Sequence, residues 1–249
     1  MIPVLPLLTS SWQFYRSNFA TLIGYAAWIL VPYLALVVFY LLVPNVDQIF
    51  GPWLPLYIVI IFAQGIITIW ASNAIMITVN EMLAEKNIKP ELINRRSWHM
   101  IIPVLWVALI STLAVLGGFL LLIIPGVIFS IWFAFSQTAV VLDDKRGVDA
   151  MSYSRSLVVG RFWSMVRRII LGPFILVFIY LVVISLLVGL GIIITGLDAS
   201  ITETTQIPVW PDIVENVVNV FFLPLYIVYW TILYRNVKET RQLDNQTTR

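Results

Sequence analysis

The chain carries few residues of the types that perform catalysis, and their spacing matches no catalytic pattern. The only histidine, His99, stands beside Trp98 at the start of a long apolar run. A lone histidine in that place fits a polar anchor at a membrane interface better than a group that handles protons. Asp143 and Asp144 are adjacent, but adjacent helical side chains diverge by about 100°. We therefore expect them to be solvated charges at a helix end rather than a paired acid and base.

Other catalytic and metal-binding motifs are missing from the sequence as well. It contains no Gly-rich phosphate loop, no strained serine nucleophile turn and no His–Glu zinc motif. It also contains no cysteine, which excludes disulfides, thiolate metal sites and cysteine nucleophiles. We therefore expect no catalytic residues, no metal and no cofactor, and we interpret the chain as a non-enzymatic protein.

A stripe of uncharged polar residues offers a different kind of chemistry. Gln64, Thr68 and Ser72 follow one another at intervals of four, with Asn73 beside them, and this spacing puts the first three on one face of a helix. Such a stripe either lines a substrate path or joins helices through hydrogen bonds worth roughly 0.6–2 kcal/mol each. We favour packing and keep the path as the alternative.

The segment 149–168 combines positive charge with apolar surface. Its arginines and tryptophan are Arg155, Arg161, Trp163, Arg167 and Arg168. Apolar residues at near-helical spacing between them predict an amphipathic helix at the headgroup layer, where each cation contributes roughly 1 kcal/mol of attraction to anionic lipid. Two compatible interpretations follow: a site for anionic phospholipid, or a charge cluster that only fixes the orientation of the chain.

Composition identifies the medium around these residues. Of the 249 residues, 60% are hydrophobic and only 11% are charged, whereas soluble domains have roughly 25% charged residues. The mean hydropathy is +0.94. An ordinary soluble enzyme, a disordered chain and a nucleic-acid-binding domain are excluded, because their surfaces need charged side chains that this chain lacks. The sequence therefore predicts an integral membrane protein.

Six segments are long enough to cross about 30 Å of hydrocarbon. They are residues 19–43, 56–79, 100–123, 125–142, 169–197 and 213–234. An aromatic-rich segment, 5–18, predicts an interfacial helix before them, and the polar tail 235–249 is expected to fray. The third and fourth spans share one uncharged run, so we expect a tight hairpin between Gly117-Gly118 and Pro125-Gly126. The prediction is a single all-α membrane domain over 1–249, a polytopic bundle of six transmembrane helices with interfacial amphipathic helices at its N-terminus and on its cytoplasmic side.

The positions of the basic residues predict the orientation of this bundle. All 15 Lys and Arg residues fall in the segments 1–18, 80–99, 143–168 and 235–249. These segments lie on one side of the predicted spans, and the positive-inside rule makes that side cytoplasmic. We expect a multi-pass protein of the cytoplasmic (inner) membrane of a prokaryote, with both termini in the cytoplasm. Whether the Arg-Ser pairs at 96–97 and 155–156 mark an internal repeat stays open.

Several short motifs resemble a known family. They are Ser11-Trp12, Tyr15-Arg16, Asn18-Phe19, Ile124-Pro125-Gly126-Val127, Trp132-Phe133-Ala134-Phe135, Val140-Val141-Leu142-Asp143, Arg155-Ser156 and Gly160-Arg161-Phe162-Trp163. Together they resemble the membrane domain ahead of the catalytic domain in some glycerophosphoryl diester phosphodiesterases, and related stand-alone six-span bacterial proteins. The resemblance implies a helical membrane module, sometimes coupled to phospholipid breakdown. It carries over no catalytic residues, because that chemistry uses a separate soluble domain with paired histidines and metal-binding carboxylates.

The leading hypothesis is a lipid-interacting or partner-organising module of the cytoplasmic membrane. In this hypothesis the arginines of 149–168 bind anionic phospholipid on the cytoplasmic side, and another membrane protein is a candidate partner, whereas nucleic acid is not. The alternative is a transporter that moves a small molecule or lipid through the helical bundle along the stripe at Gln64. A membrane enzyme ranks last, since it would depend on His99 or on the two adjacent aspartates.

Overall fold

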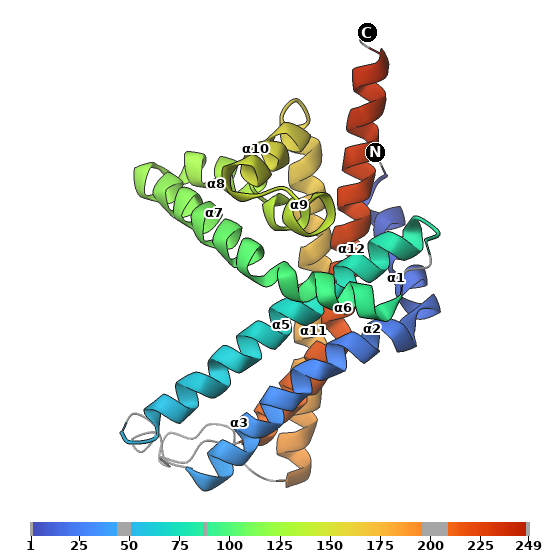
Figure 1. The fold of residues 1–249 in the computed structure, drawn as a ribbon. Coiled ribbons are helices and arrows are strands. Elements are labelled where there is room, and N and C mark those ends of the chain that lie inside the picture. Colours follow the sequence, from blue (N-terminus) through green and yellow to red (C-terminus); the bar gives the residue numbers. More distant parts are fainter. Residues whose placement is uncertain (1, 44–50, 87–88, 196–208, 248–249) are drawn as a thin grey trace.

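The computed structural model describes residues 2–43, 51–86, 89–195 and 209–247, and within these residues the fold is all-α, as predicted (Figure 1). The helices are α1 (Val4–Ser17), α2 (Phe19–Ala26), the 3-10 turn η1 (Ala27–Ile29), α3 (Leu30–Leu42), α5 (Leu54–Leu83), α6 (Pro90–His99), α7 (Ile101–Leu121), α8 (Ile123–Trp132), α9 (Ser136–Asp143), α10 (Gly147–Val158), α11 (Phe162–Thr195) and α12 (Val209–Thr247).

Six helical segments of the described chain are long and apolar enough to cross a membrane. They are Phe19–Leu42, Leu54–Leu83, Ile101–Leu121, Ile123–Asp143, Phe162–Ile194 and Trp210–Asp244. The first combines α2, η1 and α3, and the fourth combines α8 and α9. The tight hairpin is also where the glycine and proline residues placed it, because only Leu122, in an extended conformation, separates α7 from α8. The protein is thus a polytopic helical membrane protein.

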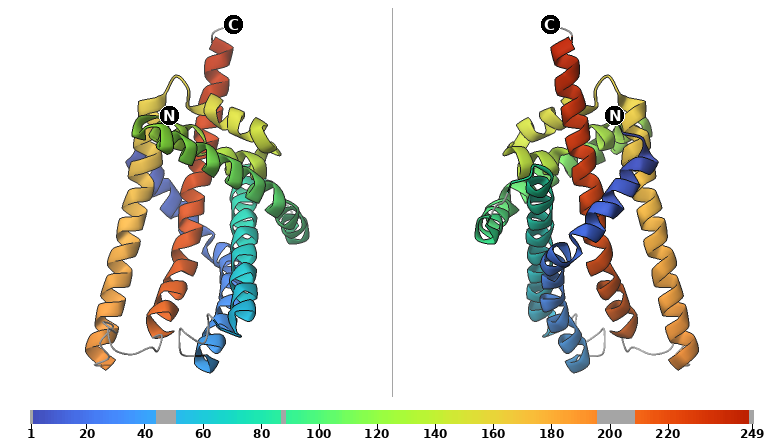
Figure 2. Two further views of the ribbon diagram at one scale, coloured as in Figure 1. Left: turned by 90° about the vertical axis from the view of Figure 1, so that its left-hand side faces the viewer. Right: turned by 90° about the vertical axis from the view of Figure 1, so that its right-hand side faces the viewer.

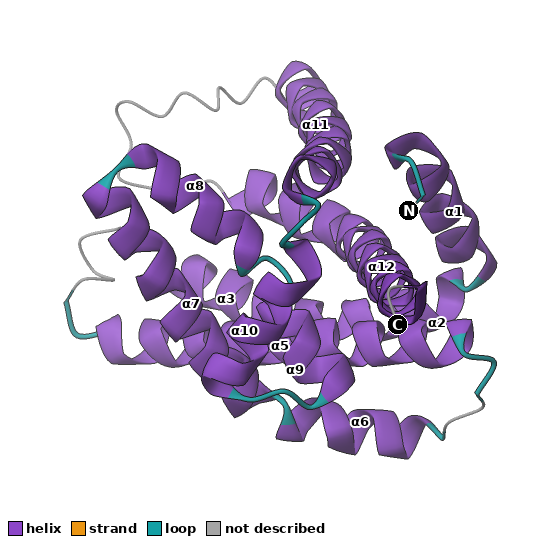
Figure 3. Ribbon diagram, turned by 90° about the horizontal axis from the view of Figure 1, so that it is seen from above, coloured by secondary structure: helices purple, strands orange, loops and turns teal. Residues whose placement is uncertain are grey.

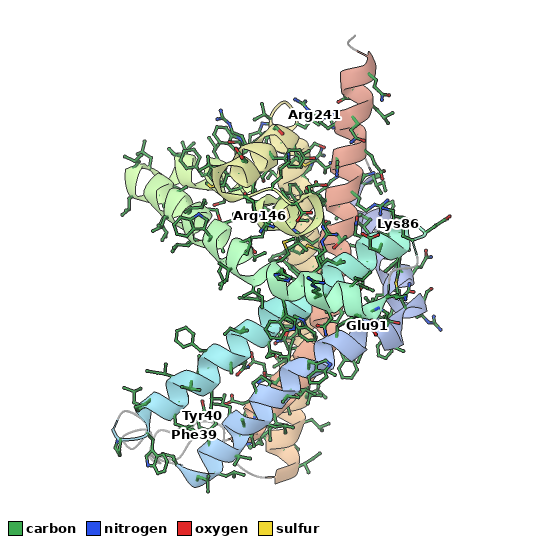
Figure 4. The ribbon with its side chains drawn as sticks, viewed as in Figure 1. Phe39, Tyr40, Lys86, Glu91, Arg146 and Arg241 are labelled. Atoms are coloured by element: carbon green, nitrogen blue, oxygen red, sulfur yellow. The ribbon has the colours of Figure 1, made fainter. Side chains whose placement is uncertain are left out.

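The bundle has two distinct ends. At one end lie the last residue of α3, the first of α5, the last of α11 and the first of α12 (Figure 2). At the other lie α1, α6, α10 and the C-terminal half of α12, and we call this the basic end. Lys86, Arg146 and Arg241 lie toward it, whereas Phe39 and Tyr40 lie toward the opposite end (Figure 4).

Helix α12 is the centre of the packing. It contacts α1, α5 and α11, which surround it when the molecule is seen from above (Figure 3). Its Tyr229 is fully buried and donates a hydrogen bond of 2.7 Å to the carbonyl oxygen of Arg168 in α11. Gly172 makes this contact fit, because a Cβ at that position would overlap the Tyr229 phenol. The two helices therefore approach closely only because residue 172 lacks a side chain.

The chain near the N-terminus is fixed between α11 and α12. The Ile2 N–H donates to Asn236 Oδ1 at 3.0 Å, and the Ile2 carbonyl accepts a hydrogen bond of 2.7 Å from Arg168 Nε. The following helix α1 buries Leu7 and Tyr15, and the Tyr15 hydroxyl donates to the Phe221 carbonyl of α12 at 3.0 Å. The helix predicted before the first span therefore exists, and it is attached to the bundle near both of its ends.

Two expectations about the polar segments were wrong. The segment 149–168 is not one helix, because α10 ends at Val158 and α11 begins at Phe162. Gly160 lies between them with φ +86°, a conformation that favours glycine and breaks the helix. The segment 235–247 is not frayed but continues α12. It stays helical because its inner face is packed, with Val237 fully buried.

Candidate functional site

The break at Gly160 distributes the predicted lipid-binding residues over two helices. Arg155 lies in the last turn of α10, exposed to solvent, with its guanidinium carbon 4.3 Å from the centre of the Trp132 ring. Trp163 and Arg167 belong to the first turns of α11 and are also exposed, Trp163 to 77%. These three side chains are therefore exposed at the surface of the bundle, on two different helices.

The other two arginines have partners within the bundle. Arg161 forms an ion pair with Asp244 and donates to the Thr240 carbonyl at 3.5 Å. Burial, and next the nearby charge of Arg241, lower the pKa of Arg161. Arg168 donates to the Ile2 carbonyl and, through Nη1, to the Ser164 carbonyl at 2.8 Å. The structure therefore gives Arg161 and Arg168 a packing role that the sequence did not indicate.

A groove of about 640 Å³ runs beneath α1, between α11 and α12. Its wall is formed by Trp12 and Tyr15 of α1, by Leu176 and Ile179 of α11 and by aromatic residues of α12. Leu176 and Ile179 lie 8 and 11 residues after Arg168, so all three share one face of α11. The wall of the groove is largely apolar. Arg168 lies beyond one end of it, toward the N-terminus of α11.

The polar stripe of α5 is largely bonded within the helix itself. The Thr68 hydroxyl donates to the Gln64 carbonyl at 2.8 Å, and the Ser72 hydroxyl donates to the Thr68 carbonyl at 2.7 Å. Asn73 is buried and donates to the Ser97 carbonyl of α6 at 3.3 Å. Among these four residues, only Gln64 has a buried side-chain oxygen for which the described part of the molecule offers no hydrogen-bond partner. The contact with Ser97 favours packing for Asn73.

A polar pocket that the sequence did not predict lies at the basic end of the bundle. It has a volume of about 430 Å³ and lies between α5, α6, α9 and α12. Its charged side chains are Glu81, Lys86, Arg96, Asp143, Arg235, Lys238 and Glu239. They come from three distant parts of the sequence, so only folding brings them together. The recurrence of Tyr234, Lys238 and Gln242 at intervals of four was the one signal that α12 turns a polar face toward this pocket.

Asp143 connects two helices at the edge of this pocket. Its carboxylate pairs with the Lys238 ammonium and accepts a hydrogen bond from the Tyr234 hydroxyl. Only 16% of the Asp143 side chain is exposed. The expectation of a solvated charge was therefore wrong for Asp143. It holds for Asp144, whose side chain is 59% exposed and lies 3.3 Å from Arg96 and 3.7 Å from Arg146.

The residues weighed for enzyme chemistry lie on different elements, since Asp143 ends α9 and Asp144 follows it, whereas His99 belongs to α6. His99 is the exposed last residue of α6. Within the ranges that the structure describes, there is no group of three or more His, Asp or Glu side chains placed to hold a metal ion.

Comparisons of the chain with protein-family models, with curated proteins and with solved structures find no match in any of the three. The fold and the spans define the class, a polytopic α-helical membrane protein with six candidate spans. What can be said about its role comes from its own residues.

Proposed function

We propose that the protein is a non-enzymatic, lipid-interacting module of the cytoplasmic membrane, with its basic end toward the cytoplasm. The groove beneath α1 is the observation that carries this proposal, because it combines an apolar wall with a membrane-spanning fold. Its 640 Å³ lies within the range of about 300–1,000 Å³ that is usual for ligand pockets. We assign one acyl chain of a phospholipid to this groove.

The residues around the groove support the same assignment. Trp12 and Tyr15 are amphipathic aromatics, which favour the depth of the lipid headgroups. The exposed Arg155 and Arg167 supply positive charge at the basic end, where the headgroup of an anionic phospholipid would lie. The sequence resemblance to the membrane domain of some glycerophosphoryl diester phosphodiesterases, and to related stand-alone bacterial proteins, agrees with a lipid-related role in the inner membrane of a prokaryote, with both termini cytoplasmic.

Lipid retention in native membrane discs tests this proposal. The groove variant is Ile179→Trp, whose larger ring fills the space between α1 and α11, and its control is Leu181→Trp, since Leu181 is exposed and does not line the groove. The charge variant is Arg155→Gln with Arg167→Gln, and its control is the exposed Lys89→Gln. Mass spectrometry should show at least a twofold loss of co-purified lipid for Ile179→Trp, and a selective loss of phosphatidylglycerol for the charge variant. Retention equal to that of the two controls would contradict the proposal.

A further inference from the structure

The polar pocket at the basic end contains one side chain whose hydrogen-bonding capacity is incomplete. Glu81 lies in the last turn of α5 and is only 7% exposed. Its Oε2 atom is buried and has no hydrogen-bond partner in the described part of the molecule. A buried carboxylate oxygen without a donor is costly. The pocket is therefore built to receive a donor at this point, and a primary ammonium group supplies up to three.

The cationic side of the pocket has hydrogen-bond donors that lack an acceptor among the described residues. Arg235 directs Nη1 to the Asn80 carbonyl at 2.7 Å, but its Nη2 lies 3.9 Å from Glu239 Oε1, which is too long for a hydrogen bond. Lys86 is exposed at the rim. Guanidinium groups bind phosphate through paired hydrogen bonds, and lysine adds a point charge. Arg235 and Lys86 can therefore accept an anionic group of the same ligand.

The balance of charge calls for an anionic group on the same ligand as the ammonium. Asp143 and Lys238 neutralise each other as an ion pair. Arg96 is paired in the same way with Asp144, which does not line the pocket. The remaining charged wall consists of two cations (Lys86 and Arg235) and two acids (Glu81 and Glu239). An ammonium group beside Glu81 adds one positive charge to this balanced wall, so the same ligand should also carry an anionic group. The pocket also lies where α5 and α9 end, which is the depth of the headgroups at the edge of a bilayer.

We propose that this pocket binds a compound that carries a primary ammonium and a phosphate group, as in ethanolamine phosphate. The ammonium lies against Glu81, and the phosphate lies against Arg235 and Lys86. The ligand is either the headgroup of an aminophospholipid or a free small molecule of the same chemistry. This site is separate from the groove beneath α1, since the two share no lining residue.

Calorimetric titration of the purified full chain with O-phosphoethanolamine, inorganic phosphate and ethanolamine tests the proposal. O-phosphoethanolamine should bind at least tenfold more tightly than either fragment. Glu81→Gln should weaken its binding at least tenfold while leaving phosphate binding unchanged, whereas Lys86→Gln should weaken both. The matched control is Glu85→Gln, because Glu85 is exposed and does not line the pocket. Since Lys86 is on the surface, its variant keeps the test decisive even if Glu81→Gln does not fold.

Two nanodisc preparations separate the two sources of the ligand. If the ligand is a headgroup, O-phosphoethanolamine should bind in discs of phosphatidylglycerol and fail to bind in discs of phosphatidylethanolamine, where lipid occupies the pocket. If the ligand is free, binding should be equal in both. The proposal is overturned if O-phosphoethanolamine binds no better than phosphate, if β-alanine binds as well as O-phosphoethanolamine, or if the pocket variants match the control.

Discussion

Replacing Asp143 by asparagine should destabilise the protein far more than the same change at the neighbouring Asp144. Asp143→Asn removes the charge that pairs with Lys238 and weakens the hydrogen bond from the buried Tyr234. Breaking a buried ion pair costs about 3–5 kcal/mol, and a hydrogen bond to a charged group contributes about 1.5–3 kcal/mol. Because a third of the Lys238 side chain is exposed, we expect a loss of about 3 kcal/mol. Asp144→Asn affects only exposed pairs and should cost about 0.5 kcal/mol.

Thermal unfolding in detergent, followed by tryptophan fluorescence, measures this difference. For a chain of this size, 1 kcal/mol corresponds to about 2–4 °C in the midpoint of unfolding. The expected decrease is therefore roughly 6–12 °C for Asp143→Asn and about 1–2 °C for Asp144→Asn. A double-mutant cycle with Lys238→Met should give a coupling energy above about 0.5 kcal/mol. Equal decreases for the two aspartate variants, or no coupling to Lys238, would refute the assignment of Asp143 to the α9–α12 contact.

Three further predictions concern other parts of the bundle. Gly172→Ala places a Cβ against the Tyr229 phenol and should lower the free energy of unfolding by about 1–3 kcal/mol. Gly189→Ala should be nearly neutral in the same unfolding assay, because no atom lies within 4 Å of the added Cβ. Residues 120–124 form an apolar tip whose side chains are 68–89% exposed, so we expect this tip to face lipid. Leu121→Cys in this cysteine-free chain should therefore react at least tenfold more slowly with a membrane-impermeant maleimide than Gly51→Cys. Equal rates would disprove this expectation. Burial raises the pKa of Tyr15 to about 12 from 10, so the stabilisation by its neutral phenol should be complete below pH 10 and lost as the pH rises through 12. Thermal unfolding between pH 9 and pH 12 should show this loss in the natural chain and a smaller one in Tyr15→Phe.

The spans and the hairpin could be predicted from the sequence because their causes are local. Length and apolar composition mark a membrane-spanning helix, and the glycine and proline residues around Leu122 mark the turn between α7 and α8. A separate helix before the first span could be predicted for the same reason, from the aromatic and polar residues of 5–18. What composition did not indicate was that a polar segment such as 235–247 would remain helical, since its helicity depends on packing.

The polar pocket could not be predicted because its residues meet only in the folded bundle. Asp143 and Asp144 are indistinguishable as sequence, yet Tyr234, 91 positions away from Asp143, distinguishes them in space. The same holds for Arg161 and Arg168, whose partners Thr240 and Ile2 are 79 and 166 positions away. Charge alone indicated that these arginines lie at one end of the bundle. It did not indicate which of them are exposed and which hold helices together.

The attachment of Ile2 between α11 and α12 has a consequence for how the protein is assembled. Ile2 and Asn236 are 234 positions apart, so α1 leaves the ribosome long before its partners exist. Until α11 and α12 have been inserted, the side of α1 that holds Leu7 and Tyr15 has only the membrane interface to cover it, a location that suits an amphipathic helix. A nascent chain arrested before residue 209 should therefore leave α1 open to protease. We expect the docking of α1 to be a late step in biogenesis, because it requires α12.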